Sequence, residues 1–214
     1  MSQTALNLAA ICVFLITFSI LLGPFLSIPP ELPAIATISL LGLATVDTFK
    51  FQGQGGSLLV DWFAQRSPAH RARIAHHEAG HFLVAHHFGM TVTDYSLSAW
   101  SARRKGQPGL GGVSVAEPTS NQLSAQDIDR YCTVWMAGIA AEQIVYQTAE
   151  GGSDDRAKLQ GLLAPLGLDP QQKERLAIFQ AKNLLQTNWS TYQALVAAMQ
   201  SGKSIAECQQ ILAA

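Results

Sequence analysis

Two histidines and a glutamate occupy positions that suit metal-assisted hydrolysis, in the sequence HEAGH at positions 77–81. Residues four apart lie one turn apart on the same side of an α-helix, so the imidazoles of His77 and His81 can bind one ion. Zinc accepts imidazole nitrogens at about 2.0–2.1 Å and keeps one position for water in catalytic sites. Glu78, beside the metal, would act as the general base on that water. The spacing therefore predicts a zinc-dependent metallopeptidase site.

A helix that begins at Ser67-Pro68 and ends near Phe88 is predicted to carry this run. Serine is a favoured N-cap, proline is favoured in the first turn, and Gly89 is a natural helix end. The two histidines share one face of this helix with apolar residues at three- and four-residue spacing, so we expect that face to be buried.

The motif is open to a second interpretation, in which it lies on a solvated helix with scattered histidines. Gly80 argues for a packing or substrate-approach role, because glycine weakens a helix by about 1 kcal/mol relative to alanine. We interpret His76, His86 and His87 as surface residues, and His70 as structural or partly exposed.

A third ligand has to come from outside this helix, because a catalytic zinc usually has three protein ligands. No histidine follows His87, so the third ligand must be a carboxylate or a cysteine. In the segment EGGSDD at positions 150–155, the glycines allow close backbone approach, and Ser153 is a predicted N-cap. Aspartates in a first helical turn can equally compensate the helix dipole. The residues alone leave these candidates open: Asp127, Asp129, Cys132, Glu142, Glu150, Asp154 and Asp155.

Three segments, taken in order, resemble the successive signatures of the FtsH family of ATP-dependent, membrane-bound zinc proteases. They are HEAGH at 77–81, AGIAAE at 137–142 and GGSDD at 151–155. The resemblance extends from Pro68 to the C-terminus and implies a zincin-like, mainly helical peptidase domain. It also implies that Asp155 is the third zinc ligand, with Asp154 in place of the family's asparagine. Glu142 matches a family glutamate and is a candidate for orienting a ligand.

The remaining peptidase region is predicted to be mainly α with a small β-sheet. Residues 91–100 and 110–115 are the expected strands, joined by a polar, basic loop over 101–108. The second strand is rich in glycine and resembles the family's edge strand, which is thought to pair with the substrate backbone. A core hairpin strand is the alternative interpretation. Further helices are expected over 127–146, 154–163, 169–186, 189–199 and 205–212.

The N-terminal region contains no charged residue from Met1 to Pro30. The apolar run from Thr4 to Ser27 is long enough for the roughly 20 residues of a spanning helix. Prolines then force a turn, and a shorter apolar run over 34–46 favours a transmembrane helical hairpin. The basic residues that follow, Lys50, Arg66, Arg71 and Arg73, would place the peptidase domain on the cytoplasmic or stromal side.

These patterns predict three parts: residues 1–50 as a membrane anchor of one or two transmembrane helices, 51–66 as a linker, and 67–214 as the peptidase domain. The net charge is −1, and the basic residues of the 101–108 loop are interpreted as solvated, which argues against a nucleic-acid partner. The three cysteines form no CxxC pair, so a disulfide framework is not expected.

The predicted function is a membrane-anchored zinc metalloendopeptidase that hydrolyses unfolded or membrane-associated proteins. The family joins its peptidase to an ATPase, and residues 202–204 (GKS) lack the glycine of a phosphate loop at position 197. The expected partners are therefore a separate AAA ATPase, FtsH-type subunits or further copies of this chain. The alternative is a non-catalytic membrane subunit that assembles with or modulates FtsH-type proteases. Arg71 and Arg73 beside the motif argue against an intramembrane protease.

Overall fold

The computed structural model describes residues 3–51, 54–105, 112–115 and 123–213. These residues form two compact units, Met1–Ser67 and Pro68–Ala214. The division falls at the predicted start of the motif-bearing helix.

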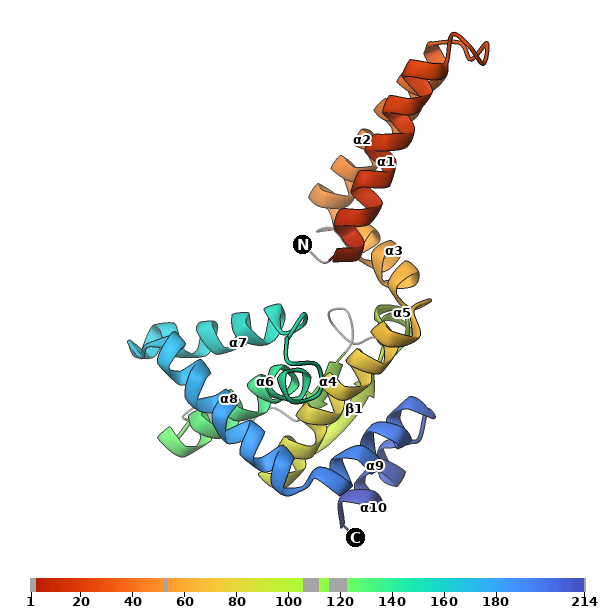
Figure 1. Ribbon diagram of the computed structural model, residues 1–214. Coiled ribbons are helices and arrows are strands. Elements are labelled where there is room, and N and C mark those ends of the chain that lie inside the picture. The colour runs from red at the N-terminus through yellow and green to blue at the C-terminus, as the bar shows by residue number, and fades with distance from the viewer. Residues whose placement is uncertain (1–2, 52–53, 106–111, 116–122, 214) are drawn as a thin grey trace. The chain divides into compact units, whose positions relative to one another are not determined.

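The first unit is a pair of antiparallel helices followed by a third, shorter one (Figure 1). Helix α1 spans Gln3–Leu22, α2 spans Glu31–Phe51 and α3 spans Gln54–Ala64. Helix α2 is longer than its apolar run, because Glu31 suits the positive end of the helix dipole and Pro33 lies in the first turn, where no backbone N–H is needed. The two helices of the predicted hairpin and the turn between them are confirmed.

Large apolar side chains of α1 and α2 are solvent-exposed within this unit, among them Phe14, Leu15, Ile38 and Leu43. Across the described ranges, no helix is long and apolar enough to cross a membrane. Membrane insertion of the hairpin therefore stays a prediction.

Most of the predicted linker over 51–66 is helical, because α3 already begins at Gln54. The carboxylate of Asp47 in α2 accepts a hydrogen bond from the backbone N–H of Gly56 at 2.8 Å. This contact satisfies one of the N–H groups that a helix start leaves open, and so offsets the low helix propensity of glycine.

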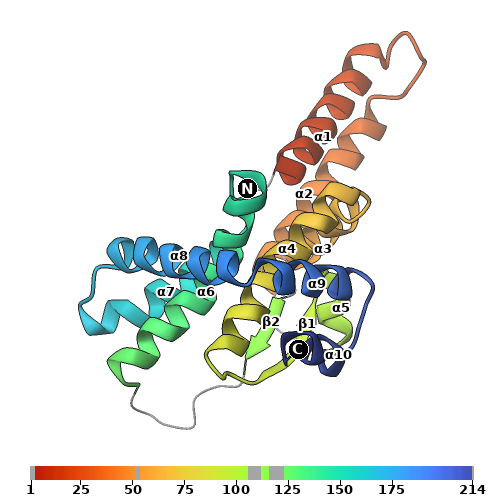
Figure 2. The ribbon, with the colours of Figure 1, turned by 60° about the horizontal axis from the view of Figure 1, so that its bottom comes forward.

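The second unit is mainly helical with one small sheet (Figures 1 and 2). Strand β1 (Val92–Ser96) pairs antiparallel with β2 (Gly112–Val115), with Val92 opposite Val115 and Ser96 opposite Gly112. The helices are α4 (Pro68–His87), α5 (Ala99–Arg104), α6 (Ala125–Tyr146), α7 (Ser153–Leu163), α8 (Pro170–Thr187), α9 (Trp189–Gln200) and α10 (Ile205–Ala213), with a 3₁₀ turn η1 (Ala164–Leu166).

The first predicted strand ends earlier than expected, because residues 99–104 form α5 instead of strand and loop. The Ser98 side chain accepts a hydrogen bond from the Ser101 backbone N–H at 3.1 Å and caps this helix. Ala99 and Ala102 are buried on its inner face. The capped helix therefore forms in place of the strand that the partial alternation of apolar and polar residues predicted. Of the predicted second strand, residues 110 and 111 lie outside the described residues.

The centre of the second unit is the crossing of α4 and α6, which α8 covers along α6 (Figure 2). A methyl group built on Gly80 would lie 2.6 Å from the carbonyl oxygen of Ala137, so the two backbones touch. The interpretation of Gly80 as a packing residue is confirmed. Phe82 and Val84 of α4 extend this contact into the core. Helix α9 closes that core with Tyr192, Leu195 and Met199, and α10 closes it with Cys208.

Replacing Gly80 with alanine is expected to lower the free energy of unfolding by about 1–3 kcal/mol, because the new methyl group meets backbone that cannot turn aside. Gly161→Ala in α7 is the matched control. A methyl group there meets nothing within 4 Å, so its helix propensity should stabilise the protein by up to about 1 kcal/mol. Urea unfolding followed by circular dichroism measures the free energy of unfolding of both variants. Equal values for Gly80→Ala and Gly161→Ala would contradict the backbone contact between α4 and α6.

Candidate metal centre

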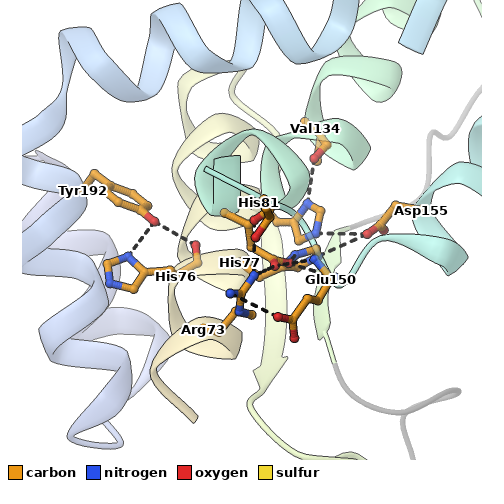
Figure 3. A network of polar contacts seen from close by, with 11 residues as sticks. Arg73, His76, His77, His81, Val134, Glu150, Asp155 and Tyr192 are labelled. Carbon is orange, nitrogen blue, oxygen red and sulfur yellow. Dashed lines mark hydrogen bonds and ion pairs between the residues drawn. The ribbon is translucent and has the colours of Figure 1, made fainter. Parts of the chain in front are cut away.

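Two imidazoles and one carboxylate converge in the second unit (Figure 3). His77 and His81 come from successive turns of α4, and their ring centroids are 4.7 Å apart. Asp155 comes from α7, and its Oδ2 lies 3.3 Å from His77 Nε2 and 3.4 Å from His81 Nε2. The three residues offer ligand atoms within 4.8 Å of one another and could hold a metal ion.

Asp155 is placed by the apolar face of α7. Leu159 and Leu163, four and eight residues further on, are fully buried against α6 and α8 and share this face with Asp155. Asp155 is therefore 8% exposed, whereas Asp154 points to solvent. The geometry selects the aspartate that the family resemblance indicates.

Each histidine is oriented by a partner on its other ring nitrogen. His81 Nδ1 lies 2.7 Å from the carbonyl oxygen of Val134 in α6, and His77 Nδ1 lies 2.7 Å from Glu142 Oε1. Both partners accept hydrogen bonds only, so each Nδ1 carries a proton, and Nε2, which faces Asp155, is the nitrogen left to bind a metal ion. This is the arrangement that metal-binding histidines require.

Glycines make room for the His77 ring. A methyl group on Gly138 of α6 would lie 2.3 Å from His77 Nε2, and one on Gly151 would lie 3.2 Å from His77 Cε1. Gly152 has a φ of 91°, a left-handed conformation that favours glycine. The close backbone approach predicted for this glycine pair is confirmed, and it brings the loop before α7 against the imidazole.

The charges of the centre suit a cation. Burial raises the pKa of Asp155, but the two histidines outweigh it and hold that pKa well below its usual range. Burial lowers the pKa of His77, yet the hydrogen bonds that His77 donates to Asp155 and Glu142, together with the charge of Glu78, raise that pKa to about 10. In the absence of a metal, a proton on His77 therefore balances the surrounding carboxylates.

Glu78 completes the centre on the side of the sheet. It is buried on α4, and its Oε2 has no hydrogen-bond partner among the described residues. A methyl group on Gly112 of β2 would lie 3.8 Å from this oxygen, so the glycine end of the strand faces it. A buried carboxylate oxygen without a partner calls for a water or ligand proton.

The structure gathers the predicted residues His77, Glu78, His81 and Asp155 at one place. The other third-ligand candidates have different contacts: Asp127 caps α6, Asp129 binds Lys173, Glu150 binds Arg73, and Cys132 is buried beside α7.

Two local predictions are wrong. His76 is half-buried instead of on the surface, because its Nδ1 lies 2.9 Å from the Tyr192 hydroxyl oxygen and its ring packs against Tyr146. Ser153 is the first residue of α7 instead of its N-cap, which is Gly152. The sequence did not identify Arg73 as a member of the site, although the spacing places it one turn before His77 on the same helix. In the structure, Arg73 forms an ion pair with Glu142.

No protein-family model matches the chain, and the curated proteins contain no match.

Loaded with zinc as a test ion, the 214-residue protein is expected to retain one ion per chain. Asp155→Ala is expected to abolish stoichiometric binding because it removes a carboxylate that faces both imidazoles. Asp154→Ala is the matched control: it removes the same charge from the neighbouring, exposed position and should leave binding intact. Elemental analysis after dialysis measures the metal content. Equal zinc content in the two variants would contradict the assignment of Asp155.

Proposed function

We propose that this chain is a zinc-dependent metalloendopeptidase that hydrolyses unfolded or membrane-associated proteins. The observation that carries the proposal is the buried, unpartnered Oε2 of Glu78 beside the group formed by His77, His81 and Asp155. A purely structural metal site has no need of a buried carboxylate oxygen that accepts no hydrogen bond from the described residues. The order of the three segments that resemble the FtsH family supports the same function.

The donor set favours zinc over the harder cations. Calcium and magnesium prefer all-oxygen sites, whereas two imidazoles and one carboxylate are a recurrent catalytic zinc set. When bound, zinc would polarise the scissile carbonyl and lower the pKa of water. His77, His81 and Asp155 would hold it, with Glu142 and the Val134 carbonyl keeping the two rings in orientation.

Glu78 has the position of a general base. It lies between the two histidines on α4, and one of its carboxylate oxygens keeps its lone pairs for a proton. In the proposed reaction, Glu78 takes a proton from the attacking water and later passes it to the leaving amine. Its burial keeps bulk water from competing for that oxygen.

Substrate binding along β2 would bring a peptide past Glu78. Strand β2 pairs with β1 on one edge, and within the described residues no strand pairs with its other edge. A substrate strand added there would be held by main-chain hydrogen bonds, which tolerate many side chains. Gly112, the strand residue that approaches Glu78, leaves room for the substrate backbone.

Membrane attachment through the first unit is the second part of the proposal. Residues 1–30 carry no charge, and the apolar side chains of α1 and α2 are exposed to solvent in the isolated chain. A hairpin inserted in the bilayer would bury them, with the peptidase unit on the cytoplasmic or stromal side. A separate AAA ATPase, FtsH-type subunits or further copies of this chain are the partners we propose for substrate delivery.

Glu78→Gln is expected to lower kcat/KM on unfolded casein by about 10²–10⁴-fold, since that is the usual contribution of a general base. Zinc content should stay at the wild-type level because the amide keeps the shape of the side chain. Glu207→Gln, on the surface of α10, is the control and should retain full activity. If the zinc-loaded wild type cleaves casein no faster than Glu78→Gln, the chain is not a peptidase, and a non-catalytic subunit explains the fold better.

The paired substitution Ile11→Asp and Leu15→Asp is expected to move the chain from the membrane pellet into the alkaline-carbonate supernatant. Each aspartate costs about 2.5–3.5 kcal/mol at the centre of a spanning helix, and both positions are exposed on α1. The control pair Leu176→Asp and Phe179→Asp alters exposed apolar residues of α8 and should leave fractionation unchanged. Wild-type protein in the supernatant would contradict membrane insertion.

A further inference from the structure

Arg73 connects three elements around the metal centre (Figure 3). It lies on α4 one turn before His77, with its side chain 18% exposed. Its Nη1 donates to Glu142 Oε2 at 2.9 Å and to the Thr148 carbonyl oxygen at 3.2 Å. Its Nη2 lies 3.2 Å from the Glu150 carboxylate, and the guanidinium stacks 4.3 Å from the ring centre of Tyr146.

Glu142 is the residue through which Arg73 reaches the ligands. It is 1% exposed, and both of its oxygens are fully engaged. Oε1 accepts from His77 Nδ1 and from the Gly151 backbone N–H, while Oε2 accepts from Arg73 and from the Glu150 backbone N–H. Burial raises the pKa of Glu142, but these hydrogen bonds lower it to about 2.

We propose that Arg73 is a positioning residue that sets the metal affinity of this site by fixing the Glu142 carboxylate and the loop before α7 to the helix of the two histidines. The inference rests on the metal site of the proposed function. Arg73 contacts Glu142, Thr148, Glu150 and Tyr146, and therefore acts on the metal ligands only through other residues.

The physical reason is that the ligands come from separate elements. His77 belongs to α4 and Asp155 to α7, and residues 148–152 lead directly into α7. The Nη1 group of Arg73 donates to both the Glu142 side chain and the Thr148 carbonyl, which holds this loop against the carboxylate that orients His77. Without Arg73, the buried Glu142 anion would keep one imidazole and two backbone N–H groups but no cation on Oε2, and the loop would lose two contacts.

Surface ion pairs rarely have such effects, because solvent screens them. Arg130 and Asp127 form a pair of that kind, with side chains 37% and 42% exposed. Arg130→Gln is therefore a matched control: it removes the same charge and chemical group from a pair outside the centre.

The experiment measures the zinc dissociation constant of the full-length protein by competition with a chromophoric chelator. Arg73→Gln should weaken zinc binding about 10- to 100-fold, the usual effect of losing a partner of a metal ligand. Arg73→Lys keeps the charge without the planar fork and should show an intermediate loss. Arg130→Gln should match the wild type. Thermal unfolding in EDTA reports whether each metal-free variant folds.

A second comparison separates positioning from general stability. If Arg73 acts through Glu142, the double variant Arg73→Gln, Glu142→Gln should bind zinc little worse than Glu142→Gln alone. Wild-type affinity in Arg73→Gln, or equal losses in Arg73→Gln and Arg130→Gln, would overturn the inference. A lower unfolding temperature with unchanged zinc affinity would also overturn it. Failure of the wild type to bind zinc would instead remove the proposed function, and this inference with it.

Discussion

The contact between the backbones of α4 and α6 is the constraint on which the rest of the structure depends. It exists because Gly80 and Gly138 present no side chain where the helices cross. Alanine at Gly80 would push against the Ala137 carbonyl, and alanine at Gly138 would occupy the position of the His77 ring. The same close approach brings the Val134 carbonyl and the Glu142 carboxylate within hydrogen-bond distance of the two imidazoles. Packing and ligand orientation therefore have one origin.

Around this contact, the polar groups are arranged from the inside outward. The imidazoles and Asp155 face one another, the partners of the histidines lie behind them, and Arg73 lies behind Glu142. Buried charge is tolerable only where each group is paired. Oε2 of Glu78 departs from this rule within the described part of the chain. Because the other charged groups of the site are paired, the unpaired oxygen of Glu78 indicates a catalytic role for this side chain and not a structural one.

The local parts of this arrangement could be predicted from the sequence, and the tertiary parts could not. Helical spacing is enough to place His77 and His81 on one buried face, because both belong to the same helix. The choice of Asp155 needed the family resemblance, although its spacing to Leu159 and Leu163 was available as a signal. The roles of the Val134 carbonyl and Arg73 depend on how α6 and the loop before α7 meet α4. Spacing along the chain does not fix such contacts.

The most direct test of the account is zinc K-edge X-ray absorption on the zinc-loaded, full-length protein. The account predicts two imidazole nitrogens at about 2.0–2.1 Å, with carboxylate and water oxygens at about 2.0–2.2 Å and no sulfur. Sulfur scattering at about 2.3 Å would place the metal on a cysteine. A shell without imidazole would place it elsewhere, and either result would contradict a centre built from His77, His81 and Asp155.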